Sequence, residues 1–261
     1  MKTFKTLLLA AAAFAAVSSV AMADIVFGTD AAPYPPFTSQ NAAGEWEGWE
    51  YEAMLGVCAE MNEKCTMIPI AWDGIIPALL EKKMDGIFGS MAMNDERKKQ
   101  ISFSDMYYDS ATVLIGPKGG DKNFTPETFK GKTIGVQGAT SNANYVEKYY
   151  VPTGAIVKAY KGQDEVNADM LAGRVDYVVA DGVSLKSFLE TPDGACCEVY
   201  GPVPHDAAVL GNGVGVGFRK EDTALLEKVN AAIKSFANKG GFEALNKKYK
   251  LEGLMMTAPK S

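Results

Sequence analysis

Two polar residues follow apolar segments at matching positions in two similar stretches of the chain, and both could contact a small ligand. Residues 79–90 read LLEKKMDGIFGS and residues 170–181 read MLAGRVDYVVAD. Each stretch predicts a helix end, an aspartate, an apolar strand and then a polar residue, Ser90 or Asp181. In open α/β sheets, ligands bind at the carboxyl ends of the strands. The repeat therefore predicts two similar halves that face each other across a binding cleft.

Three side chains could hold charged groups of a ligand, and each also has an ordinary structural interpretation. Asp181 ends an apolar strand, so its carboxylate either meets a cation or caps the following helix. Thr140 precedes a predicted helix over residues 142–149, whose first backbone N–H groups favour an anion, and a plain helix N-cap would look the same. Arg97 offers a two-pronged guanidinium to a carboxylate, but its place in the run DERKK favours a solvated surface charge.

Other chemistries have little support in the sequence. The only histidine, His205, is interpreted as a surface residue, because metal clusters and Ser-His-Asp triads need more partners. The sequence contains no Walker loop or dinucleotide fingerprint. The formal charge of −6 at pH 7 disfavours nucleic acid as a partner. We therefore predict no catalytic residue, no metal and no cofactor.

Alternating short strands and helices must position these residues. Apolar runs predict strands over 25–29, 86–88, 133–136 and 177–180, and helical spacing predicts helices over 49–61, 75–80, 164–171 and 225–236. Asp73 is expected to cap the second of these helices, and Gly240-Gly241 to end the last. This alternation is typical of an α/β protein with largely parallel sheets.

The first 23 residues read as a secretory signal peptide. Lys2 and Lys5 precede an apolar run from Leu7 to Val17, and the segment AMA at 21–23 forms a small-x-small cleavage site. A membrane anchor is the alternative, but the apolar run is short for a full span.

Export would permit disulfides between the four cysteines. Cys58 and Cys65 are separated by a helix end and a turn, so they can form a local bridge. Cys196 and Cys197 are adjacent, and both a strained bridge and two thiols remain open.

An ordered series of motifs resembles the type 3 periplasmic amino-acid-binding proteins of ABC importers, above all the lysine/arginine/ornithine-, histidine- and opine-binding branch. The motifs lie between residues 24 and 251: GTD at 28–30, YPPF at 34–37, WDGIIPAL at 72–79, GSMAM at 89–93 followed by Arg97 and FS at 103–104, GVQGAT at 135–140, and AD at 180–181. The spacing of Cys58 and Cys65 also resembles the disulfide of that branch.

The resemblance implies an α/β, two-lobed periplasmic-binding-protein fold of type II with two crossover hinge strands. After the signal peptide at 1–23, lobe one would comprise residues 24–109 and 211–261, and lobe two residues 110–210.

The resemblance also implies roles for site residues. A free amino acid carries a carboxylate and an ammonium, and neither is buried without a partner. Arg97 and Thr140 would hold the carboxylate, one from each lobe, while Asp181 and the carbonyl of Ser90 would hold the ammonium. Gly89 belongs to the same ligand-binding segment. Ala92 replaces the family's usual Ser or Thr, which removes one hydrogen bond of order 1 kcal/mol.

The side-chain pocket implied by the resemblance consists of Asp30, Tyr34 and Trp72. The two aromatic rings would sandwich the ligand's side chain and attract a cation, and Asp30 would meet a distal ammonium or guanidinium. One extra residue, around Pro33, departs from the family's spacing between Asp30 and Tyr34. The pocket predicts a basic L-amino acid such as arginine, lysine, ornithine or histidine, or a related opine.

These inferences predict a monomeric, non-enzymatic binding protein of the periplasm. Its lobes would close on the ligand by a hinge motion and then dock on an inner-membrane ABC permease, whose ATPase subunit uses ATP. Two alternatives remain. One is an enzyme of the prephenate or arogenate dehydratase type on the same scaffold, and the other is a sensory partner that presents ligand to a membrane receptor.

Overall fold

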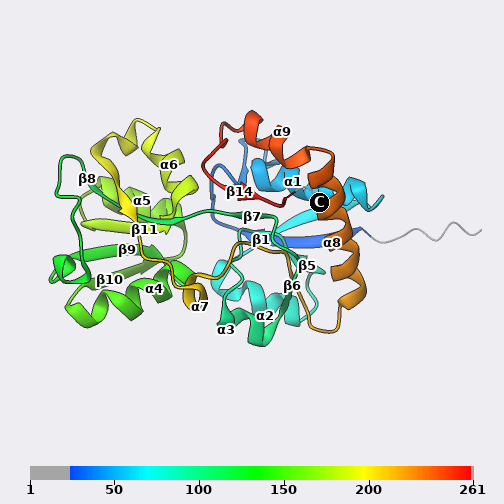
Figure 1. Cartoon of the computed structure of the whole chain (residues 1–261), viewed down its shortest axis with the longest axis horizontal. Helices are drawn as coiled ribbons and strands as arrows, with labels where there is room; N and C mark the ends of the chain where they lie inside the picture. Colours follow the sequence, from blue (N-terminus) through cyan, green and yellow to red (C-terminus); the bar gives the residue numbers. More distant parts are fainter. Residues whose placement is uncertain (1–23, 260–261) are drawn as a thin grey trace, which may run out of the picture.

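The computed structural model describes residues 24–259 as two lobes that lie side by side, with chain segments crossing between them (Figure 1). The predicted signal peptide, residues 1–23, lies outside the described residues. Within residues 24–259, every helix is too short or too polar to cross a bilayer.

The first lobe is built on a five-stranded sheet in the order β4-β1-β5-β13-β6. Its strands are β1 (Ile25–Asp30), β4 (Cys65–Ile70), β5 (Gly86–Ile87), β6 (Ser102–Phe103) and β13 (Gly217–Phe218). Its helices are α1 (Trp49–Glu60), α2 (Ile75–Leu80), α3 (Asp95–Gln100), α8 (Thr223–Asn238) and α9 (Gly241–Lys248). Figure 1 shows α2 and α3 on one side of this sheet and α1 and α9 on the other.

The second lobe repeats this plan with the order β10-β9-β11-β8-β12. Its strands are β8 (Thr112–Pro117), β9 (Thr133–Gln137), β10 (Ile156–Tyr160), β11 (Tyr177–Asp181) and β12 (Cys197–Pro202). Its helices are α4 (Ser141–Tyr149), α5 (Gln163–Leu171) and α6 (Gly182–Leu189), with α7 (Ala207–Leu210) on the returning segment. The division at residues 109/110 and 210/211 remains our proposal for the lobe boundaries.

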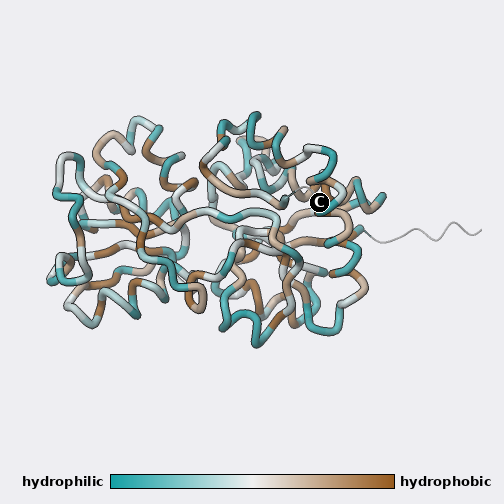
Figure 2. Tube along the Cα trace, in the orientation of Figure 1, coloured by the Kyte–Doolittle hydropathy of each residue, from teal (hydrophilic) through white to brown (hydrophobic). Residues whose placement is uncertain are grey.

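Both faces of the second-lobe sheet are covered, which explains why its central strand β11 is apolar up to its last residue. In β11, Val178 and Ala180 belong to the apolar cluster on one face, whereas Val179 belongs to the cluster on the other. Figure 2 shows the same distribution, with hydrophobic segments inside each lobe and hydrophilic ones along its outer loops.

The sheets are largely parallel in strand direction, as expected, but each contains one reversed strand and is therefore mixed. The pairs β1–β4, β1–β5, β9–β10 and β9–β11 are parallel, whereas β8 and β13 run antiparallel to their neighbours. Both β8 and β13 enter their sheets directly after a crossover from the other lobe (Figure 1). These two strands therefore run in the opposite direction to the strands that are connected through helices within one lobe.

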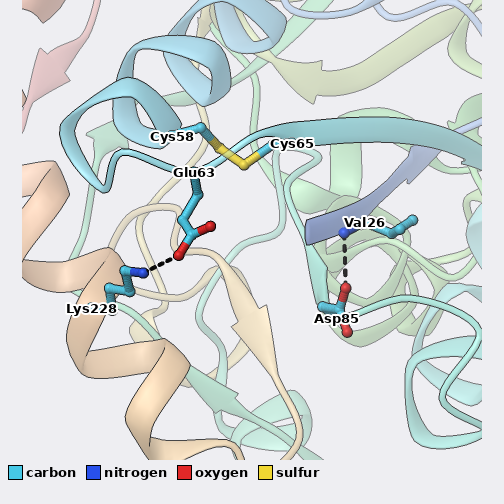
Figure 3. Close-up of a disulfide and its surroundings, with 6 residues drawn as sticks. All are labelled: Val26, Cys58, Glu63, Cys65, Asp85 and Lys228. Atoms are coloured by element: carbon cyan, nitrogen blue, oxygen red, sulfur yellow. Dashed lines mark hydrogen bonds and ion pairs between the residues drawn. A yellow bond between two sulfur atoms is a disulfide. The ribbon is translucent and has the colours of Figure 1, made fainter. Parts of the chain in front are cut away.

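The internal repeat predicted from the sequence has a structural counterpart in both lobes. Asp85 accepts a hydrogen bond from the N–H of Val26 at 2.8 Å (Figure 3), and Asp176 accepts one from the N–H of Thr133 at 2.8 Å. In each lobe the aspartate therefore fixes the start of a strand beside its parallel neighbour.

Two smaller predictions have different outcomes. Asp73 does not cap α2: it lies inside the 3₁₀ turn Trp72–Gly74, and Gly74 occupies the N-cap without a side-chain hydrogen bond. The backbone of the turn satisfies the first N–H of α2 instead, because the N–H of Ile75 donates to the carbonyl of Trp72. At the end of α8, Gly240 adopts a left-handed conformation with φ of 78°, as expected for a terminating glycine.

Both cysteine pairs are bridged. The Cys58–Cys65 disulfide joins the end of α1 to the start of β4, next to an ion pair between Glu63 and Lys228 of α8 (Figure 3). Cys196 and Cys197 form a bridge between adjacent residues, which decides between the two states that the sequence left open.

Candidate functional site

A cavity lies between the two lobes at the carboxyl ends of β1 and β9. Its first-lobe lining is Thr29, Asp30, Tyr34, Thr38, Trp72, Gly89, Ser90 and Arg97, and its second-lobe lining is Gln137, Thr140, Ser141 and Asn142. A neighbouring cavity contains Ala92 and Asp181 and shares Tyr34, Ser90, Ser141 and Asn142 with the first. The nine predicted site residues are thus brought to one cleft, divided into two connected parts.

Arg97 is a buried cation, contrary to the surface interpretation of its local sequence. The N-cap Asn94 starts α3 by accepting a hydrogen bond from the N–H of Arg97 at 3.0 Å, and the Arg97 side chain then turns inward. The residue is only 7% exposed, and burial lowers the pKa of its guanidinium to about 10. Throughout residues 24–259 no carboxylate lies within ion-pair distance of it.

The partners of this guanidinium are neutral and come from both lobes. It donates to the carbonyls of Ala92 at 3.1 Å and Ala139 at 3.3 Å, and it lies 5.3 Å from the ring centroid of Trp72. The indole Nε1 of Trp72 also donates to the carbonyl of Ala139 at 3.1 Å. Trp72 therefore stacks on Arg97 in this structure, as well as bordering the cavity predicted to receive a ligand side chain.

Asp30 is the buried carboxylate of the cavity. It is 7% exposed, and burial raises its pKa. One of its oxygens accepts the N–H of Ala32 at 3.1 Å, and the other accepts the side-chain amide of Gln137 from the second lobe. Sequence reasoning missed Gln137, although it ends strand β9 at the same kind of sheet edge that identified Ser90 and Asp181.

Thr140 is a helix N-cap at the rim of the cavity. Its hydroxyl accepts the N–H of Ala143 at 3.1 Å and donates to the carbonyl of Gln137 at 2.7 Å. The first residues of α4, Ser141 and Asn142, follow it into the cavity lining. The structure thus contains the helix start that the sequence predicted, and an anion here would meet the first backbone N–H groups of α4.

Asp181 is also an N-cap, which is the structural alternative considered from sequence. One oxygen accepts the N–H groups of Val183 at 2.8 Å and Ser184 at 3.1 Å, and the other accepts the hydroxyl of Ser110 on the crossover segment. Burial raises the pKa of Asp181. Its role as an ammonium partner stays a prediction, and a ligand there would share the carboxylate with the start of α6.

The segment Gly89-Ser90 is tightly constrained. A Cβ on Gly89 would lie 2.8 Å from Oγ1 of Thr29, so only glycine fits there without a shift. Ser90 has a left-handed backbone with φ of 52°, which is uncommon for a residue other than glycine. Its N–H and hydroxyl both donate to Glu50, a residue that sequence reasoning did not single out.

A cleft between two α/β lobes, with charged groups at facing sheet edges, defines the class of two-lobed solute-binding proteins. Residues 25–252 match the family model of the bacterial extracellular solute-binding proteins, family 3, and the chain belongs to this family.

Known relatives agree with that assignment. The chain is 35% identical to the histidine-binding periplasmic protein of Escherichia coli over 241 residues, 92% of this chain and 91% of the relative. It is 36% identical to the lysine/arginine/ornithine-binding periplasmic protein of the same species over 238 residues, 90% and 91% of the two chains. The predicted family, two-lobed fold, solute-binding function and periplasmic location are therefore confirmed.

A solved structure provides the corresponding comparison of folds. An ancestral arginine-binding protein bound to arginine superimposes with a TM-score of 0.79 at 29% identity, covering 87% of this chain and 97% of the other.

Proposed function

We propose that this protein captures a basic L-amino acid, such as arginine, lysine, ornithine or histidine, or a related opine, by closure of its two lobes. It would deliver the ligand as a monomer to an inner-membrane ABC permease with its ATPase. The observation that carries the proposal is the buried guanidinium of Arg97, which has no carboxylate partner in the described chain. A buried charge is costly without a counter-charge, and the carboxylate of an amino acid would supply it.

Three further observations support the choice of a zwitterionic ligand with a basic side chain. The start of α4 at Thr140 faces the same cavity and favours an anion. Asp30 supplies a buried negative charge at the same cavity, where a distal cation would replace or join the amide of Gln137. The names of the related proteins, which bind histidine, lysine, arginine and ornithine, point the same way.

The proposal is tested by thermal unfolding of refolded, ligand-free protein against a panel of amino acids and opines. A ligand present at a hundred times its dissociation constant should stabilise the folded state by about 2.7 kcal/mol. Stabilisation by basic amino acids is the expected result. Stabilisation only by neutral or acidic amino acids would refute the basic-ligand assignment, and a response to none of them would refute amino-acid binding.

We also propose that the protein is not an enzyme. A dehydratase of prephenate or arogenate needs an acid placed at the leaving group. In this cleft the carboxylate of Asp181 already accepts hydrogen bonds from the start of α6 and from Ser110. The carboxylate of Asp30 accepts them from Ala32 and Gln137. The relatives named above are binding proteins. Incubation with prephenate, followed by an assay for phenylpyruvate, should detect no product, and measurable turnover would overturn this proposal.

A further inference from the structure

Glu50 is a fully buried carboxylate behind the cleft, outside the predicted site. It lies in the first turn of α1 and is 0% exposed. One of its oxygens accepts the N–H of Ser90 at 2.6 Å and the hydroxyl of Tyr107, and the other accepts the hydroxyl of Ser90 at 3.0 Å. All three donors are neutral. No lysine or arginine among residues 24–259 forms an ion pair with Glu50.

This arrangement holds Ser90 by two groups at once. The left-handed backbone of Ser90 costs roughly 1–2 kcal/mol for an L-residue, so the surrounding structure must stabilise it. Two hydrogen bonds, donated to the Glu50 carboxylate by the backbone N–H and the side-chain hydroxyl of Ser90, do so. Because Ser90 lines both parts of the cleft, Glu50 is one residue removed from the ligand.

Among residues 24–259, no basic side chain supplies a counter-charge to Glu50. Burial raises its pKa to about 7, while the hydrogen bonds from Tyr107 and Ser90 act in the opposite direction. Asp181, across the cleft, adds a like charge that raises the pKa further. A cation bound beside Ser90 would therefore be attracted by two carboxylates, one in each lobe.

We propose that Glu50 is a positioning residue of the binding site, which fixes the conformation of Ser90 and places a buried negative charge behind the position that receives the ligand's ammonium group. This inference rests on the proposed function, because it assumes that an amino acid occupies the cleft. It assigns part of the recognition of the ammonium to a side chain that never touches the ligand.

Two substitutions separate the charge of Glu50 from its hydrogen bonds. Glu50→Gln has the same shape, and its amide can accept from the N–H of Ser90 and the hydroxyl of Tyr107 while donating to the hydroxyl of Ser90. Glu50→Ala removes both charge and bonds. The matched control is Glu52→Gln on the same helix, where the carboxylate pairs with Lys248 on the surface.

The measurement is the affinity of each variant, by calorimetry, for arginine and for deamino-arginine, which lacks only the α-ammonium. We expect Glu50→Gln to weaken arginine binding by about tenfold and deamino-arginine binding by less than about twofold. Glu50→Ala should weaken both ligands further, because Ser90 is no longer held. Glu52→Gln should bind like the wild type. If the wild-type protein binds another amino acid instead, that amino acid and its deamino analogue replace this pair.

The outcomes distinguish this inference from the proposed function. If the wild-type protein binds no amino acid at all, the proposed function fails. If the wild-type protein binds and Glu50→Gln binds equally well, or loses both ligands to the same extent, the charge role of Glu50 is refuted. Wild-type affinity in Glu50→Ala would refute the positioning role. In the wild type, arginine affinity should fall below pH 7, where Glu50 becomes protonated, and this fall should be absent in Glu50→Gln. A purely structural role of Glu50 would not produce this difference.

Discussion

The side-chain amide of Gln137, at the end of β9, donates a hydrogen bond to the carboxylate of Asp30, at the end of β1 in the other lobe. The same amide donates to the carbonyl of Lys161 at 3.1 Å. Together with the contacts of Ala139 with Trp72 and Arg97, this bond joins the two lobes across the cleft. A distal cation of a ligand would have to compete with Gln137 for Asp30.

Substitution of Gln137 should therefore loosen the closed arrangement. We expect Gln137→Ala to lose roughly 0.5–1.5 kcal/mol of the interaction between lobes. Small-angle scattering of the ligand-free variant should show a larger radius of gyration than the wild type, and saturating ligand should remove the difference. An unchanged radius would mean that the other contacts across the cleft suffice for closure.

Asp30→Asn tests the predicted specificity pocket. The amide keeps an oxygen for the N–H of Ala32, whose bond is 3.1 Å long, but it loses the charge. Affinity for lysine and arginine should fall by about tenfold or more, whereas a neutral amino acid such as glutamine should be affected little. Calorimetry with each ligand decides the matter, and equal lysine affinity before and after the change would remove Asp30 from the pocket.

Arg97→Met should separate stability from function. The substitution removes a buried guanidinium that has only carbonyl and aromatic partners, so the ligand-free variant should be as stable as the wild type or up to about 1–4 kcal/mol more stable. Binding should fall by more than about a hundredfold, because the ligand's carboxylate then has no counter-charge. Urea unfolding measures the free energy of unfolding, and calorimetry measures the ligand affinity. The control is Lys98→Met at the exposed neighbour, which should change neither.

Glu50 predicts a specific dependence of stability on pH. Its pKa is about 7 in the folded protein against 4.5 ordinarily, so the folded state binds more protons between these values. This group's contribution is therefore fully present below about pH 4.5 and is lost as the pH rises towards 7, a difference of at most about 3 kcal/mol. Ligand-free Glu50→Gln should show a smaller decline than the wild type in urea unfolding between pH 5 and 8. Parallel curves for the two proteins would contradict the assignment.

Much of this protein follows from local sequence. The strand at residues 25–30 and the helix at 49–60 are determined by neighbouring residues, because hydrophobic periodicity acts within a few positions. The rule that ligands bind at the carboxyl ends of strands then placed Ser90 and Asp181 at the cleft.

The tertiary structure decided which of these polar groups oppose one another. Gln137 and Asp30 are 107 positions apart, and Ser90 lies 40 positions from Glu50, so no local pattern links either pair. Arg97 has the sequence neighbours of a surface residue, yet it is buried against Ala92 and Trp72 of its own lobe and Ala139 of the second lobe. Hydrogen bonding and burial at a site between lobes depend on how distant segments pack, whereas strands, helices and caps depend on residues close in sequence.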